Sequence, residues 1–114
     1  MEACIFCKIV AKEIPAGFVY EDEWVVAFAD IHPMAPHHYL IIPRRHLASV
    51  NEAEADDAAE LGRLFVAARR IAESRGFAKE GYRLVVNTGA HAGQAVGHLH
   101  LHLLAGREMG WNPA

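Results

Sequence analysis

The stretch that decides the fold is Gly97-His98-Leu99-His100-Leu101-His102-Leu103-Leu104, in which histidine and leucine alternate. Successive side chains of a β-strand point to opposite faces, so a strand places the histidines on one side and the leucines on the other. A helix would spread the same histidines over about 200° and mix them with leucines. The alternation therefore predicts a strand with a buried leucine face and an exposed row of imidazoles that meets a ligand.

Five strands and two helices are predicted from the surrounding sequence. The strands are rich in aromatic and β-branched residues, whereas residues 31–36 carry two prolines and form an irregular loop. The expected strands are 18–22, 24–29, 37–43, 82–87 and the histidine run, and a short helix is expected over 4–12. Because strands arrive as hairpins with one long helix inserted, the predicted fold class is α+β with an antiparallel sheet.

The long helix is expected to begin after Asn51 and to end at Gly76. Asn51 is a good N-cap, and Glu54 stands where the second residue of a capping box is found. Glycine is the usual residue just beyond a helix C-terminus. The predicted buried stripe follows helical spacing and consists of Leu61, Leu64, Phe65, Ala68 and Ala72.

Length and composition indicate one small globular domain over residues 1–114. The sequence is 53% apolar and 22% charged, and its net charge of −3 gives no electrostatic reason to bind nucleic acid or an anionic membrane. Its apolar runs are too short to span a bilayer. The acidic start, Met1-Glu2-Ala3-Cys4, lacks the apolar core of a signal peptide, so a cytoplasmic location is expected.

Cys4 and Cys7 are the two cysteines of the chain and have C-x-x-C spacing. In a cytoplasmic protein this spacing indicates half of a metal site or a redox pair before it indicates a structural disulfide. Two partly buried thiols on a short helix remain the alternative.

The histidine row suits nucleophilic catalysis better than a shared metal ion. Alternate strand residues lie about 6.6 Å apart, so a straight strand cannot bring three imidazoles onto one zinc, although one of them can serve a metal elsewhere. A neutral imidazole can attack phosphorus and form a covalent intermediate. The glycine-containing turn over residues 88–94 can add backbone N–H donors suited to phosphate. A purely structural role is less expected for three histidines in strict alternation than for one.

These residues resemble the histidine triad (HIT) nucleotide-binding family. Residues 98–104 match its H-φ-H-φ-H-φ-φ signature, where φ is an apolar residue. Further similar blocks are Ile5-Phe6, Glu13-Ile14-Pro15, residues 27–31, Pro36-His37-His38, residues 42–46, Val86-Asn87, Gly93-Gln94 and residues 106–111. The last block looks most like the Hint branch, whose members are purine nucleoside phosphoramidases.

The resemblance implies a histidine-triad fold: a five-stranded antiparallel sheet with one longer and one short helix, extended across a homodimer. It implies a hydrolase that cleaves purine nucleoside phosphoramidates through a nucleotidyl-histidine intermediate and releases the nucleoside monophosphate. The alternatives are a nucleotide-binding regulatory module with weak catalysis and a dinucleoside polyphosphate hydrolase.

By the same resemblance, His100 is the nucleophile, His102 contacts phosphate and His38 supports the cluster. Asp30 matches the carboxylate that binds ribose, which suits an acceptor of two hydroxyl hydrogen bonds. The implied nucleotide-binding residues are Ile5, Phe6, Phe28, Asp30, Ile31, Asn87, Gly93, Gln94, Ala95, His100 and His102. Ala95 departs from the serine or threonine of many Hint members, so slower turnover is expected.

The resemblance also implies a structural zinc held by Cys4, Cys7, His46 and His98, while catalysis needs no cofactor. A Cys₂His₂ set forms a closed tetrahedral site with no open position for chemistry. The remaining histidines match no family role and are expected to be solvated loop residues: His32, His37 and His91.

Overall fold

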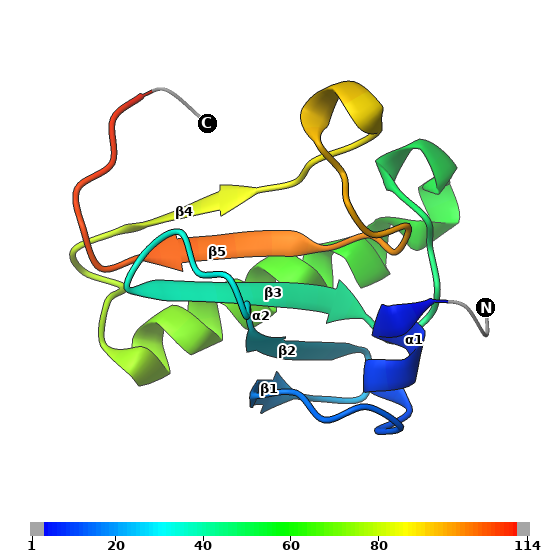
Figure 1. The fold of residues 1–114 in the computed structure, drawn as a ribbon, viewed down its shortest axis with the longest axis horizontal. Coiled ribbons are helices and arrows are strands. Elements are labelled where there is room, and N and C mark those ends of the chain that lie inside the picture. The colour runs from blue at the N-terminus through cyan, green and yellow to red at the C-terminus, as the bar shows by residue number, and fades with distance from the viewer. Residues whose placement is uncertain (1–3, 112–114) are drawn as a thin grey trace.

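Residues 4–111 are described by the computed structural model, and Figure 1 shows them built around one antiparallel sheet. Its strands are β1 (Phe18–Glu21), β2 (Val25–Ala29), β3 (His37–Pro43), β4 (Tyr82–Val85) and β5 (Leu101–Ala105). They lie in the order β1-β2-β3-β5-β4, and each neighbouring pair is antiparallel. The predicted α+β fold with a five-stranded antiparallel sheet is confirmed.

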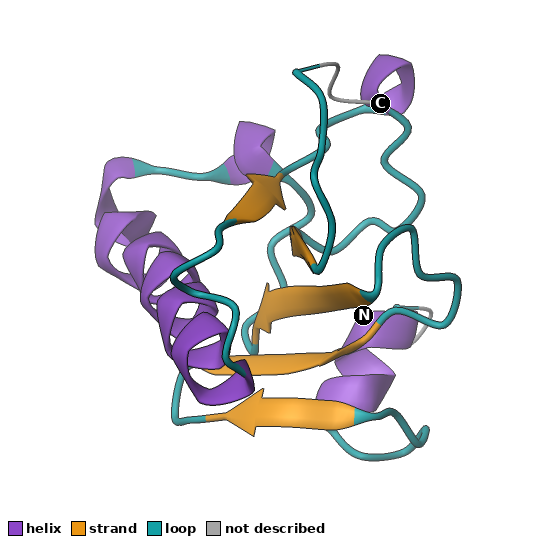
Figure 2. Ribbon diagram, turned by 90° about the vertical axis from the view of Figure 1, so that its left-hand side faces the viewer, coloured by secondary structure: helices purple, strands orange, loops and turns teal. Residues whose placement is uncertain are grey.

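The two helices pack on opposite faces of the sheet, as Figure 2 shows. A larger apolar cluster joins the sheet to α2 (Ala58–Arg75), and a smaller one joins the other face to α1 (Ile5–Val10). Central strand β3 contributes to both, since Ile41 belongs to the larger cluster and Ile42 to the smaller. Burial of both faces explains why this strand is almost continuously apolar.

The leucine half of the histidine run is buried as predicted. Leu99, Leu101 and Leu103 are at most 3% exposed and pack on the α2 side. The regular strand begins only at Leu101, however, so the prediction that β5 contains the whole run is wrong. Its partner β3 ends at Pro43, which has no N–H to continue the ladder. The Leu99 N–H donates to a loop carbonyl instead, at 2.7 Å.

The long helix begins later than predicted. Asn51 lies within a 3₁₀ turn (Val50–Glu52), so its assignment as the N-cap paired with Glu54 is wrong. Glu54 does take part in a capping box, but its partner is Asp57, and α2 begins at Ala58. The Asp57 carboxylate accepts the Glu54 N–H at 2.8 Å, and such local side-chain bonds favour a tight turn over a continuous helix.

The buried stripe of α2 is rotated from the predicted one. Phe65 is 51% exposed and Leu61 is half-buried, so their assignment to the buried face is wrong or incomplete. The buried residues are Leu64, Ala67, Ala68, Ile71 and Ala72. Alanines allow the helix to lie close to the sheet, which decides the rotation where hydropathy alone favours Phe65. The predicted stop at Gly76 is confirmed by its left-handed φ of 83°.

His37 corrects the prediction of three solvated loop histidines. It begins β3, is half-buried, and its ring lies 4.8 Å from the ring of Phe77. Its Nδ1 is 3.0 Å from the Tyr39 hydroxyl. His32 is exposed in a loop, as expected, and His91 is exposed in the 3₁₀ turn Ala90–Ala92.

The remaining sequence predictions concern the ends of the chain and the membrane. Within residues 4–111, no helix is both long and apolar enough to cross a membrane. Residues 1–3 and 112–114, the ends of the predicted 1–114 domain, lie outside the described residues.

Candidate active site

The histidines of the run lie on the α1 side of the sheet, opposite the leucines. They do not form the open row that alternation predicted, because His98 is fully buried and His100 is only 6% exposed. Phe6 of α1 covers them, with its ring 5.9 Å from the ring of His98 and 5.3 Å from that of His100. His102 alone is half-exposed. Helix α1, far away in sequence, thus turns an apparent surface row into a sheltered site.

His100 is held in a single tautomer. Its Nδ1 lies 2.8 Å from the backbone carbonyl of His98, and a carbonyl can only accept, so Nδ1 must carry the proton. The other ring nitrogen, Nε2, is then a lone pair without a proton. A neutral imidazole with its nucleophilic nitrogen free and its opposite nitrogen anchored is suited to attack an electrophilic centre.

His38 and His102 form a second pair whose protons can also be assigned. The Met34 N–H donates to His38 Nδ1 at 3.0 Å, so the proton of His38 sits on Nε2. That Nε2 is 2.9 Å from His102 Nδ1 and 3.4 Å from a carboxylate oxygen of Asp30. His102 therefore accepts at Nδ1 and carries its own proton on Nε2, where it can donate to an anion.

Burial favours the neutral forms of His38, His98 and His102. The pKa of His102 is lowered to about 4, chiefly by desolvation and also by the nearby His100 and His38, against a smaller opposing effect of Asp30. Burial likewise lowers the pKa of His38, although the Asp30 carboxylate partly opposes the shift. The pKa of His98 is also lowered, chiefly by burial. Neutral rings are what the assigned donors and acceptors require.

The predicted base-binding residues fall into two groups. Phe6 and Phe28 are buried in the smaller apolar cluster, with their rings edge to face at 5.4 Å. Ile5 and Ile31 are exposed, at 48% and 86%. Asp30 directly follows β2 and is half-buried, and its Oδ1 accepts from a backbone N–H two residues on at 2.8 Å. Exposed isoleucines beside a sheltered aromatic pair and a carboxylate can contact a nucleoside.

The predicted phosphate loop lies between β4 and β5. Gly93 has a left-handed φ of 79°, which a residue with a side chain rarely adopts. The Gln94 side chain is occupied within the fold: its Oε1 accepts the Gly89 N–H, and its Nε2 donates to the carbonyls of Ala48 and Val96. Gln94 therefore shapes the loop through its side chain. Of the other predicted members, Asn87 is half-buried and Ala95 is exposed.

Cys4, Cys7, His46 and His98 come together at the N-terminus of α1. Cys4 Sγ lies 3.4 Å from His98 Nδ1, and Cys7 Sγ lies 3.3 Å from His46 Nδ1 and 3.6 Å from His98 Nδ1. His98 Nε2 is 2.9 Å from the Pro43 carbonyl and so carries the proton, which leaves Nδ1 as a lone pair facing both sulfurs.

These separations fit a tetrahedral metal centre. Zinc bonds of about 2.3 Å to sulfur and about 2.0–2.1 Å to nitrogen place the ligand atoms of a tetrahedron about 3.5 Å apart. The ligand atoms of the four side chains all lie within 4.8 Å of one another. The Pro43 carbonyl fixes the tautomer of His98, as an outer partner of a zinc-bound histidine commonly does.

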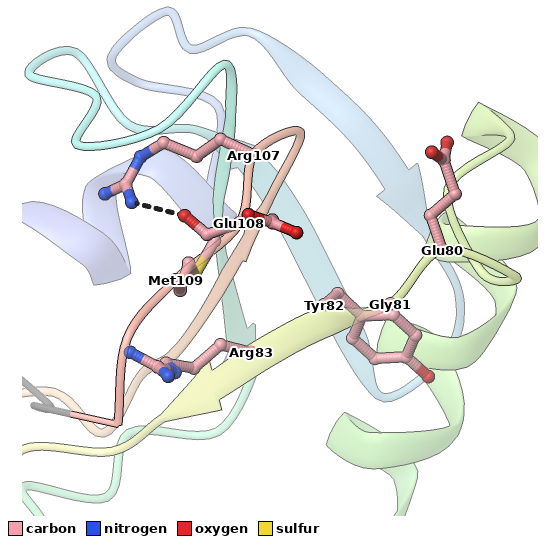
Figure 3. Close-up of a pocket in the computed structure, with 7 residues that line it drawn as sticks. All are labelled: Glu80, Gly81, Tyr82, Arg83, Arg107, Glu108 and Met109. Atoms are coloured by element: carbon pink, nitrogen blue, oxygen red, sulfur yellow. Dashed lines mark hydrogen bonds between the residues drawn. The ribbon is translucent and has the colours of Figure 1, made fainter.

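A pocket away from the histidines is drawn in Figure 3. It has a volume of about 230 Å³ and lies between β4 and the segment after β5. Its lining consists of Glu80, Gly81, Tyr82, Arg83, Arg107, Glu108 and Met109, none of which sequence reasoning assigned to the site. In Figure 3 the Arg107 guanidinium donates to the Glu108 carbonyl.

Two contributors to the site were missed at the sequence level. Met34 acts through its backbone N–H, and a backbone donor leaves no signal in a residue pattern. Arg107 reaches the carbonyl of the same residue at 3.1 Å. Only its place in the similar block 106–111 could have pointed to it.

The HIT domain pattern matches residues 11–109 of this chain. Among curated proteins, the purine nucleoside phosphoramidase of Escherichia coli strain K12 is 50% identical over 109 residues, which cover 96% of this chain and 92% of that protein.

Solved structures agree with the sequence comparison. A HIT family hydrolase from Legionella pneumophila superposes with a TM-score of 0.95 at 48% identity, covering 97% of this chain and 99% of that one. A HIT family hydrolase from Clostridium thermocellum gives a TM-score of 0.94 at 50% identity, with 96% of each chain covered.

Acid is predicted to destabilise the protein through His102. Its folded pKa of about 4 is below its ordinary 6.5, so the unfolded chain binds more protons between these values. His102 therefore leaves the free energy of unfolding unchanged above pH 6.5 and lowers it as the pH falls from 6.5 towards 4. Thermal unfolding of chelator-treated protein across this range measures the slope. His102→Gln should flatten it, because glutamine does not titrate, whereas the exposed-residue control His91→Gln should not. Equal slopes for wild type and His102→Gln would contradict the assignment.

Proposed function

This chain belongs to the HIT domain family, and we propose that it hydrolyses purine nucleoside phosphoramidates to a nucleoside monophosphate and an amine. The observation that carries the proposal is the contact of His100 Nδ1 with the His98 carbonyl, which leaves Nε2 as the lone pair of the neutral ring. The activity named for the Escherichia coli relative supports the choice of substrate class.

The reaction proceeds in two displacements at phosphorus. His100 Nε2 attacks the α-phosphorus and forms a bond to it, while the substrate P–N bond breaks and the amine leaves with its electron pair and takes a proton from solvent. Water then attacks the phosphorus and releases a proton to solvent, while the P–Nε2 bond breaks and its electron pair returns to Nε2. His102 donates its Nε2–H to a phosphate oxygen, where it stabilises the developing charge.

The ribose and the base of the nucleoside are bound by different residues on the face of the sheet that α1 covers. Asp30 accepts ribose hydroxyls with the lone pairs left over from its contacts to His38 and the backbone. The base lies against Ile5, Phe6, Phe28 and Ile31. The position of Phe6 supports this placement, because its ring lies 5.3 Å from the ring of His100.

The phosphate loop supplies further contacts through Asn87, Gly93 and Ala95, and Gln94 holds its shape. Glycine at 93 lets the backbone approach the anion closely. The Gln94 N–H already donates to the Gly89 carbonyl at 3.1 Å, and its side chain donates to the carbonyls of Ala48 and Val96, so Gln94 acts by fixing the loop. Ala95 keeps the backbone N–H and lacks a hydroxyl that could assist the phosphate or the leaving amine.

The Cys4, Cys7, His46 and His98 cluster is proposed to hold a structural zinc. A closed set of two thiolates and two imidazoles adds stability by tying α1 to the sheet and offers no open coordination position for a substrate. Catalysis therefore needs no cofactor in this proposal. The His98 ring would bind the metal, and the His98 carbonyl accepts the hydrogen bond from His100 Nδ1.

The chain is further proposed to form a homodimer through α2 and β4. Strand β4 lies at the end of the sheet order, and uncovered edge strands tend to recruit a partner. Phe65, 51% exposed, lies about 140° around α2 from Arg70, which bonds Tyr20 of β1. Phe65 thus faces the β4 side, where a second copy would cover it.

The proposed setting of this activity is the cytoplasm. Cys4 and Cys7 are free thiols, which a reducing compartment preserves. The net charge of −3 gives no electrostatic reason to expect nucleic acid or membrane partners.

Replacing His100 tests the function directly. We expect His100→Ala to lower turnover of an adenosine phosphoramidate by at least about 10³-fold, because the nucleophile is lost. Mass spectrometry of wild type quenched during turnover should detect one nucleotidyl group per chain, absent from the variant. His91→Ala is the control and should keep full activity.

Other results of this experiment would support one of the alternative functions or exclude the covalent mechanism. Binding of the nucleoside monophosphate with no turnover by wild type would favour a regulatory module. Preferential cleavage of diadenosine polyphosphates would favour the other hydrolase branch. Activity retained by correctly folded His100→Ala would exclude the covalent mechanism.

Ala95→Ser is expected to raise kcat about tenfold with little change in KM. A new hydrogen bond to a charged group is worth about 1.5 kcal/mol, which corresponds to about tenfold in rate. Steady-state kinetics on an adenosine phosphoramidate measure the change, and Ala95→Val adds bulk without a hydroxyl as a control. An unchanged or lower kcat in Ala95→Ser would show that the missing hydroxyl does not limit this enzyme.

Metal analysis tests the zinc proposal. Protein purified without chelator should contain about one zinc per chain, and Cys7→Ser should lose it, since a tetrahedral site then lacks a thiolate. Chelation should lower the midpoint of thermal unfolding by at least about 5 °C, or roughly 1 kcal/mol for a domain of this size. A zinc content near zero in wild type would remove the proposal.

A further inference from the structure

The loop between β2 and β3 carries the N–H that sets the tautomer of His38. This loop is poorly anchored by apolar burial, since Ile31, His32, Pro33 and Met34 are all exposed. Its position must therefore depend on a few directional contacts.

Those contacts come from Asp30 within the loop and from the segment that leaves β5. The Asp30 carboxylate accepts the His32 N–H at 2.8 Å. On the far side, Arg107 Nη2 donates to the Met34 carbonyl at 3.1 Å. Beside it Gly106, with a φ of 102°, packs so closely that a Cβ there would lie 2.7 Å from Pro36 Cβ. The two residues that follow β5, Gly106 and Arg107, thus contact the loop by close packing and by a hydrogen bond.

Met34 is consequently held from two sides. Its carbonyl accepts from Arg107, and its N–H donates to His38 Nδ1 at 3.0 Å. The latter bond keeps the His38 proton on Nε2, which donates to His102 Nδ1 at 2.9 Å. His102 must then present an Nε2–H towards the site. Three hydrogen bonds, linked through the Met34 backbone and the His38 ring, thus connect Arg107 to His102, the histidine proposed to contact phosphate.

We propose that Arg107 is a positioning residue for the reaction: by holding Met34, it keeps His38 in the tautomer that orients His102. The inference rests on the proposed function for the role of His102 and adds a residue outside the site that the family resemblance outlined. Without the Arg107 bond, Met34 can move away from His38 Nδ1. A neutral imidazole released from its donor can place its proton on either nitrogen. The Asp30 carboxylate, 3.4 Å from His38 Nε2, still favours a proton there, so losing the Met34 bond weakens the preference for one tautomer and mixes the two.

The test compares Arg107→Met with Arg69→Met in full-length protein. Both arginines are exposed, but Arg69 pairs with Glu73 on the surface of its own helix, so it controls for lost charge. Nitrogen-15 NMR of the imidazoles reports the tautomers of His38 and His102. Arg107→Met should mix them, while Arg69→Met and wild type keep one form each.

Kinetics provide the second readout. Arg107→Met should lower kcat about five- to tenfold with KM changed less than about twofold, because orientation in the transition state is lost. Arg107→Lys keeps one donor and should recover part of the loss. Unchanged tautomers in Arg107→Met, an equal loss in Arg69→Met, or no recovery by lysine would overturn the inference.

The two proposals fail separately. If wild type does not cleave phosphoramidates, the proposed function is wrong, yet the tautomer measurement still decides whether Arg107 orients the histidine pair. If wild type cleaves them and the tautomers of His38 and His102 are unchanged in Arg107→Met, only the positioning role is wrong.

Discussion

The antiparallel pairing of β3 with β5 is the constraint on which the rest of the molecule depends. It joins residues that are sixty or more positions apart and sets Leu40 opposite His102. The pairing ends at Ile41 opposite Leu101, and β3 itself ends at Pro43, which cannot donate a ladder hydrogen bond. Where the ladder stops, the chain before Leu101 leaves the sheet, and this exit carries His98 to the cysteines and His100 beneath α1.

One ladder end therefore gives chemically similar side chains different surroundings. His98 faces two sulfurs and a proline carbonyl, His100 is anchored on the carbonyl of His98, and His102 meets His38. Each partner fixes which nitrogen carries the proton. The division of roles follows from these donors and acceptors, since the isolated residues would be interchangeable imidazoles.

The sequence was informative where a pattern reflects local backbone geometry. Alternation identified the buried leucines, the proline pair identified the β2–β3 loop, and Gly76 marked the end of α2. It misled where tertiary packing chose between local options. Phe65 fits the predicted helical stripe but is exposed, because alanines on the neighbouring face let α2 pack closer to the sheet. The histidine row that alternation predicted to be exposed is instead partly covered by Phe6.

By itself, the sequence determined the α+β class, the antiparallel sheet and the residues that its resemblance marks as a candidate site, because these depend on side-chain period and on motif identity. Only the tertiary structure decided the proton positions. Those depend on backbone atoms of Met34, Pro43 and His98. Because backbone N–H and carbonyl groups are alike in nearly every residue, only their distance to a ring nitrogen shows which of them fixes its proton. The same holds for Arg107, whose partner is a carbonyl 73 residues away.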